Sequence, residues 1–162
     1  MRQLSTRRQA IGLLLAAALP AAAWADEDMV EFVRRLYARE VEMHNARTPP
    51  ANDEFYALFA RDLRALMQAP RPGLAREPSG PLLHAFFGWG VLPGQPVRLD
   101  KVTSAFGGTG GLKLVRVDLV VRGVPRQILV RPAREHGLWK IADISYDNGE
   151  ALAAYYRRIT AR

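Results

Sequence analysis

The sequence contains no cysteine. This absence excludes disulfide bonds, thiolate metal sites, covalently attached c-type haem and iron–sulfur clusters held by cysteine. It also removes the residue to which the lipid of an exported lipoprotein is attached. We therefore expect a soluble protein without a cofactor, whose fold is stabilised by packing and hydrogen bonds alone.

Lysine is scarce, since arginine outnumbers it 20 to 3, and the formal net charge is +7. Three of these positive charges lie in the first 25 residues, which leaves +4 on residues 26–162. The remaining basic residues are scattered among acids, whereas nucleic-acid-binding proteins usually carry a basic stripe. The sequence therefore predicts no nucleic-acid partner.

Residues 1–25 have the three parts of an export signal peptide. A positive start that includes Arg7 and Arg8 precedes an apolar run, and the small residues Ala23 and Ala25 occupy the two positions that a signal peptidase reads. The run is shorter than the roughly 20 residues needed to span a bilayer. We predict cleavage after Ala25, a single mature domain over 26–162, and no membrane span in the mature form.

The paired arginines indicate a route of export. Arg7 and Arg8 directly precede the apolar run, which resembles a twin-arginine signal. Ala10 stands where that signal usually has a bulky residue, so an ordinary secretory leader is the alternative. Either route predicts contact with the export machinery through the leader and a final location in the periplasm.

After the leader, the sequence changes from a helical period to an alternating one. Apolar residues recur at three- and four-residue spacing up to residue 68, and they alternate from residue 96. Short turns between alternating segments join antiparallel neighbours. The predicted segments are helices at 28–46 and 53–68, strands at 97–106, 112–122, 126–132 and 138–146, and a helix at 148–160. This order predicts an α+β domain in which N-terminal helices pack on a curved antiparallel four-strand meander, with a helix at the C-terminus.

Three local patterns refine this outline. Asp147, followed three residues later by Glu150, resembles a capping box at the start of the last helix. The glycines at 107–111 lead into a strand rather than a helix, which predicts a hairpin turn and not a phosphate-binding loop. Residues 81–90 form a short apolar element whose type the pattern leaves open.

The histidines do not indicate a metal site. Glu40 and His44 lie four residues apart and can share one face of the first helix. A metal site needs about three protein ligands, and no second such pair is present, while His84 and His136 stand alone in the sequence. We therefore expect structural or solvated roles for these residues.

Two aspartates lie within predicted strands, where acids are uncommon. Asp118 shares a strand face with Arg116, so the simple interpretation is a solvent-facing acid paired with a neighbouring base. The alternative is an acid in a half-open pocket, where desolvation would raise its pKa and suit acid–base chemistry. No catalytic residue follows from the pattern. The candidate pocket residues are Tyr37, Arg116, Asp118, Asp143 and Tyr146.

Three segments carry a family resemblance: VEFVRRLY at Val30–Tyr37, FARDLRAL at Phe59–Leu66, and WKIADISYDNGEAL at Trp139–Leu152. With the order of helices and strands, they resemble the nuclear-transport-factor-2-like superfamily, which includes the ketosteroid isomerases. More narrowly, the chain is similar to small exported bacterial proteins of unknown function with that fold. The resemblance implies a cone-shaped domain, to which the helix after Asp147 is an addition. Members of the superfamily bind small molecules, catalyse reactions or mediate protein contacts.

Three functions stay open on this evidence. The first is a non-catalytic periplasmic binding or interaction protein that holds a small, mainly apolar ligand. The second is an isomerase- or dehydratase-type enzyme that uses Asp118 or Asp143 with a tyrosine. The third is a protein-binding partner, such as an inhibitor or an immunity factor. We also predict that Trp139, in the most family-like segment, belongs to the hydrophobic core.

Overall fold

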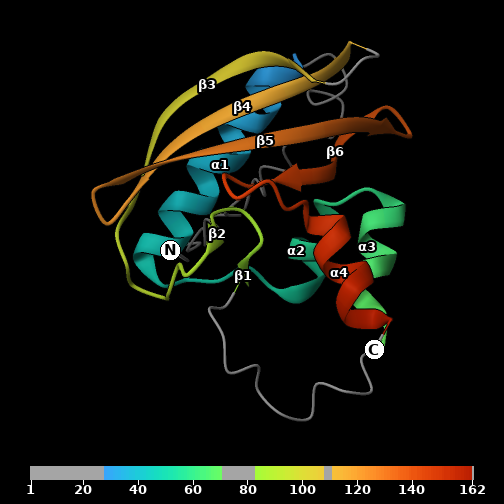
Figure 1. Cartoon of the computed structure of the whole chain (residues 1–162), viewed down its shortest axis with the longest axis horizontal. Coiled ribbons are helices and arrows are strands. Elements are labelled where there is room, and N and C mark those ends of the chain that lie inside the picture. Colours follow the sequence, from blue (N-terminus) through green and yellow to red (C-terminus); the bar gives the residue numbers. More distant parts are fainter. Residues whose placement is uncertain (1–27, 71–82, 108–110, 162) are drawn as a thin grey trace, which may run out of the picture.

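The computed structural model describes residues 28–70, 83–107 and 111–161 (Figure 1). The predicted leader, its cleavage site and its paired arginines lie outside these residues, as do most of the predicted loop at 69–80 and of the glycine-rich turn. Within the described residues, no helix has both the length and the apolar character that crossing a membrane requires.

The first helix, α1 (Met29–Ala46), confirms the predicted segment almost residue for residue. Asp28 caps its start, because the carboxylate accepts a hydrogen bond from the backbone N–H of Val30 at 2.6 Å. The helix ends at Arg47, which adopts a left-handed conformation with φ of 58° and donates its backbone N–H to carbonyls of the last turn. The proline pair that follows cannot continue the helical hydrogen bonds.

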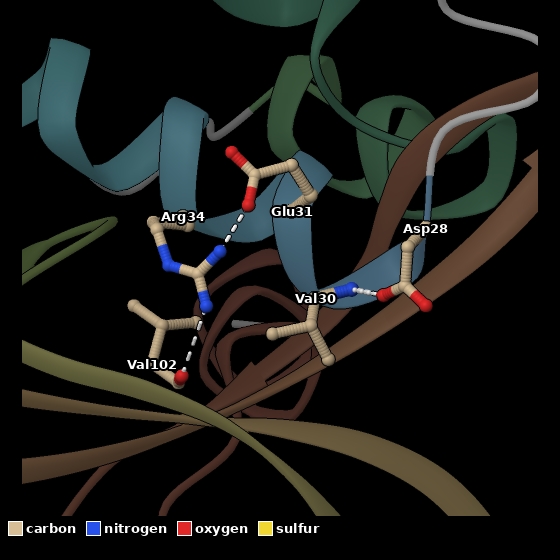
Figure 2. Close-up of polar contacts among 5 residues, drawn as sticks. All are labelled: Asp28, Val30, Glu31, Arg34 and Val102. Atoms are coloured by element: carbon tan, nitrogen blue, oxygen red, sulfur yellow. Dashed lines mark hydrogen bonds and ion pairs between the residues drawn. The ribbon is translucent and has the colours of Figure 1, made fainter.

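An arginine connects α1 to the first long strand, β3 (Val97–Gly107). Figure 2 shows Arg34 between an ion pair with Glu31, one turn earlier, and the backbone carbonyl of Val102 on β3, to which its Nη2 donates at 3.5 Å. Both side chains of the ion pair are about half exposed, so the pair stabilises α1 only weakly.

The predicted helix at 53–68 is wrong in one respect, because it is two helices: α2 (Asn52–Ala57) and α3 (Arg61–Gln68). The chain leaves the helical conformation at residues 58–60 to pair with the last strand. Ile141 donates its N–H to the carbonyl of Leu58 at 2.9 Å and accepts from the N–H of Ala60 at 2.8 Å. These tertiary hydrogen bonds override a helical propensity that is continuous in the sequence.

The sheet is an antiparallel meander in the order β3-β4-β5-β6, with β4 at Leu112–Val121, β5 at Val124–Glu135 and β6 at Leu138–Ser145. All four predicted strands are confirmed, and β5 is several residues longer than predicted. The two short apolar strands β1 (Leu83–His84) and β2 (Gly88–Trp89) form a separate two-stranded sheet. They resolve the segment that the sequence pattern had left open.

The last helix, α4 (Leu152–Thr160), begins later than predicted. The proposed capping box is wrong, since Ala151 is the N-cap residue and no side chain of its own caps the helix. Instead, the carboxylate of Asp143 in β6 accepts from the N–H of Ala153 at 3.0 Å. The start of α4 is therefore determined by a strand residue ten positions earlier, which satisfies a helix N–H that would otherwise lack a partner.

The helices pack against one face of the curved sheet (Figure 1). α1 crosses β3, β4 and β5, while α3 and α4 lie together against β6. Alternate residues of β4 point into this core, where Val115, Val117 and Leu119 are fully buried. Trp139 is only partly buried at the edge of the core and stacks on Phe32, with ring centroids 6.4 Å apart. The core prediction for Trp139 is therefore confirmed in its contacts but not in full burial.

Candidate functional site

A pocket of about 390 Å³ lies beside the C-terminal half of α1. Its walls come from α1, the segment that leads into α2, α2 itself, the β1 strand and the loop after β2. Most of the wall is apolar. The residues that line it are Glu40, Met43, His44, Arg47, Pro49, Pro50, Asn52, Phe55, His84 and Pro93. This volume lies within the range of small-molecule sites, which are typically apolar with a few placed polar groups.

Glu40 is the most unusual residue of the pocket. Among the described residues, it is the one charged side chain that is buried, with 5% of its surface exposed. Its Oε1 atom has no hydrogen-bond partner there. Burial raises the pKa of Glu40 to about 7, a rise that the nearby Arg39 guanidinium opposes. Near neutral pH this carboxyl group is therefore divided between its neutral and ionised forms.

Two tyrosines that interact with each other, Tyr37 and Tyr146, are buried in the core next to the pocket. The hydroxyl of Tyr37, one helical turn earlier, is fully buried and has no partner among the described residues. Burial, and then the Glu40 carboxylate, raises the pKa of Tyr37 above its ordinary value. The hydroxyl of Tyr146 donates to the carbonyl of Ala85 at 2.7 Å, and burial likewise raises the pKa of Tyr146. Both groups are therefore neutral and can serve as hydrogen-bond donors.

His84, which stands alone in the sequence, lies against His44 in the folded chain. Their rings meet edge to face at 5.3 Å, and both contact Phe87. The Nδ1 atom of His84 accepts from the backbone N–H of Phe86 at 3.3 Å, which leaves the proton of the neutral ring on Nε2. Burial, and then His44, lowers the pKa of His84 to about 4, so this ring is neutral at physiological pH.

Arg47 stands at the exposed rim of the pocket. Its guanidinium makes no ion pair within the described part of the chain. It lies against Gly94, where an added Cβ would come within 2.7 Å of the Nη2 atom. Gly94 also has a φ of +83°, which favours glycine. The glycine therefore leaves space for the arginine side chain to lie across the loop after β2.

A metal centre is not formed by these side chains. In residues 28–70, 83–107 and 111–161, no group of three or more His, Cys, Asp or Glu side chains converges closely enough to hold an ion. Glu40, His44 and His84 share the pocket wall without forming a ligand set.

The pocket candidates taken from the sequence divide into two groups. Tyr37, which interacts with Glu40, and Tyr146, which interacts with Tyr37, are buried in the core next to the pocket. Arg116 and Asp118 lie on the outer face of β4, where the arginine Nε donates to the aspartate at 2.8 Å. Asp143 caps α4 and also accepts from the N–H of Ile144 at 2.9 Å. None of the five candidates is among the residues that line the pocket.

Of the residues that do line it, the sequence pattern drew attention to Glu40, His44 and His84 only as possible metal ligands, for which structural or solvated roles were expected. One signal for Glu40 was present, since it continues the buried stripe of α1 formed by Val33, Leu36 and Tyr37. An acid at a buried position of an apolar stripe calls for a specific explanation. No local signal brought His84 to this site, because its place depends on how β1 packs beside α1.

Comparison of the chain with protein-family models, with curated proteins and with solved structures found no match.

Proposed function

We propose that this protein is an exported binding protein that holds a small, mainly apolar molecule in the pocket beside α1. The single observation that carries the proposal is Glu40, a buried carboxyl group whose Oε1 atom lacks a partner among the described residues, in a mostly apolar wall. Burying a carboxyl group without a hydrogen bond is costly. A ligand with a polar atom would remove that cost and would be oriented by doing so.

The fold supports the resemblance to the nuclear-transport-factor-2-like superfamily. A long first helix crosses the concave side of a four-strand antiparallel meander, and the pocket opens beside that helix. We propose membership of this superfamily on that basis. The added helix α4 lies against α3 and β6, apart from the residues that line the pocket.

Blocking the mouth of the pocket tests the binding proposal. Asn52 lines the pocket and is exposed, so Asn52→Trp should occlude the site without disturbing the core. The apolar fluorophore N-phenyl-1-naphthylamine should bind the wild type. Its affinity for this variant should be roughly tenfold lower, or lower still, because the indole ring of the tryptophan would fill the space that the rings of the fluorophore need.

Ala57→Trp is the matched control, since Ala57 is exposed on the same helix but does not line the pocket. Fluorescence titration measures the affinity of the fluorophore for wild type and for both variants. Equal affinity for wild type and Asn52→Trp, or equal losses in both variants, would contradict binding at this pocket.

An isomerase- or dehydratase-type enzyme is the second candidate, and Glu40 is the observation that favours it. A general base works best when its pKa lies near the operating pH, and the pKa of Glu40 is about 7. Asp118 and Asp143 already have partners. Deuterium exchange from solvent into the α-carbon of a panel of ketones, followed by NMR, would detect such activity. Exchange that is equal in wild type and Glu40→Gln would exclude this base.

We also propose export to the periplasm with removal of residues 1–25. The mature protein should begin at Asp26, which N-terminal sequencing of the exported form would show. A start outside residues 22–28 would contradict the cleavage prediction. Changing Arg7 and Arg8 to Lys should block export by a twin-arginine route. Unimpaired export of that double variant would instead indicate the ordinary secretory route.

A further inference from the structure

We infer that the ligand of this pocket is an amphipathic anion, with a small apolar body and one carboxylate- or sulfonate-like group that pairs with Arg47. The inference rests on the proposed binding function and adds the chemical class of the ligand. It depends on how charge is distributed between the rim and the interior of the pocket.

The rim carries a cation that makes no ion pair with the part of the chain that the structure describes. Arg47 makes no ion pair among the described residues, and the one acid that lines the pocket with it is the buried Glu40. The exposed acid Glu54, on the neighbouring α2, is already paired with Arg39 at 3.2 Å. A negative charge for the Arg47 guanidinium must therefore come from outside these residues.

The Arg47 side chain lies between the end of α1 and the loop after β2. Its own φ of 58° ends α1, and the glycine at position 94 lets the guanidinium lie against the loop after β2. A side chain at position 94 would clash with the Arg47 guanidinium in its present position, since an added Cβ would lie 2.7 Å from Nη2.

The interior of the pocket accepts the apolar body and disfavours a second anion. Met43, Phe55 and the prolines at 49, 50 and 93 supply the apolar surface. Glu40 lies deeper, and as a neutral acid it can donate a hydrogen bond to a ligand. As a carboxylate it would repel a bound anion, because charges interact strongly where water is excluded.

The groups around Glu40 that carry charge or titrate belong to several elements. On α1 they are Tyr37, Arg39, His44 and Arg47, with His84 from β1 in the same pocket wall. Further away, Tyr146 after β6 interacts with Tyr37, and Glu54 from α2 pairs with Arg39. The two tyrosines and His84 are neutral at pH 6–8, as their shifted pKa values require. Because burial raises the pKa of Glu40 to about 7, its ionisation should weaken anion binding across this interval.

Two fluorophores with the same ring skeleton provide the test. 8-Anilinonaphthalene-1-sulfonate is an anion, whereas N-phenyl-1-naphthylamine lacks the sulfonate. Wild type should prefer the anionic probe at pH 6, and Arg47→Ala should weaken that probe roughly fivefold, the effect of one partly exposed ion pair. The neutral probe should be unaffected by the same change. Arg157→Ala, which removes an exposed arginine on α4, is the matched control and should change neither affinity.

The pH dependence gives an independent readout. Affinity of wild type for the anionic probe should fall several-fold from pH 6 to pH 8, and Glu40→Gln should abolish that fall. The neutral probe should show no such change. Anionic-probe affinity that is flat in wild type, or equally pH-dependent in Glu40→Gln, would overturn the role given to Glu40.

The failures of the two proposals are distinguishable. If both probes bind equally well to wild type and Asn52→Trp, the pocket is not the binding site and the proposed function fails. If Asn52→Trp blocks the neutral probe but Arg47→Ala affects the anion no more than Arg157→Ala does, the pocket binds ligands and the anion inference is overturned. Tighter binding of the neutral probe than of the anion at pH 6 would overturn it as well.

Discussion

Replacing Glu40 by Gln is expected to stabilise the protein by about 3 kcal/mol at pH 8 and to change its stability little at pH 4. The pKa of this carboxyl group is raised from an ordinary 4.5 to about 7 in the folded protein, and each unit of difference corresponds to about 1.4 kcal/mol. Between pH 4.5 and about pH 7, the carboxyl group has lost its proton in the unfolded chain but keeps it in the folded protein. Wild type therefore loses stability as the pH rises from about 4.5 to about 7, and the neutral amide avoids that loss.

His84 acts in the opposite direction over nearly the same interval. Its pKa falls from 6.5 to about 4 on folding, so the unfolded chain takes up a proton first, and wild type loses stability as the pH falls from about 6.5 to about 4. In wild type the effects of Glu40 and His84 on stability oppose each other as the pH changes. A variant that lacks one of the two groups should show the effect of the other alone. Glu40→Gln should gain stability as the pH rises, while His84→Asn should lose it.

Urea unfolding at intervals from pH 4 to pH 8 measures these slopes. Glu42→Gln is the matched control, because Glu42 is exposed on the same helix. Its effect should stay within about 0.5 kcal/mol at every pH, as is usual for surface changes. A stability difference between Glu40→Gln and wild type that is the same at pH 4 and pH 8 would show that the carboxyl group does not titrate as described.

Replacing Phe86 by Ala is expected to cost about 3–5 kcal/mol, the range for emptying a buried aromatic position. Phe86 is fully buried between α1 and the segment that follows α2. Its ring stacks on Phe59 at 5.6 Å and meets Tyr37 and Phe55 edge to face at 5.6 and 6.1 Å. A domain of this size has a total stability of about 5–15 kcal/mol, so this variant should be recovered poorly or should unfold at much lower urea concentration.

Phe106→Ala is the same chemical change at a position with 76% exposure. It should alter stability by no more than about 0.5 kcal/mol. The loss of stability in Trp139→Ala should lie between those of Phe86→Ala and Phe106→Ala, because the Trp139 side chain is half-buried and stacks on Phe32. Equal urea midpoints for Phe86→Ala and Phe106→Ala would contradict the position of Phe86 in the core.

A buried acid that destabilises the fold at neutral pH is unusual unless it serves the function. Glutamine has nearly the same shape as glutamate and would remove the charge from the wall of the pocket. Binding sites commonly retain residues that reduce stability. The expected stabilisation in Glu40→Gln and its expected loss of pH-dependent anion binding are therefore two consequences of one carboxyl group.

Much of the secondary structure followed from the sequence by itself, for a local reason. The apolar stripe of α1 and the alternation within β4 are periodicities of neighbouring residues, and each element can be read from its own segment. The turns between the strands are similarly local, since short connections favour antiparallel neighbours. The α+β class and the four-strand meander were predictable on these grounds.

The pocket depends on tertiary structure, because the residues that line it are distant in the sequence and meet only in the folded chain. Ile141 divides one helical pattern into α2 and α3 through hydrogen bonds across more than 80 residues. The carboxylate of Asp143 accepts a hydrogen bond from the N–H of Ala153 at the start of α4, so this residue caps a helix and is not an acid of the pocket. His84 reaches His44 only because β1 packs beside α1. Periodicity shows which face of a helix is buried, but the surroundings of Glu40 on that face depend on which distant segments pack against it.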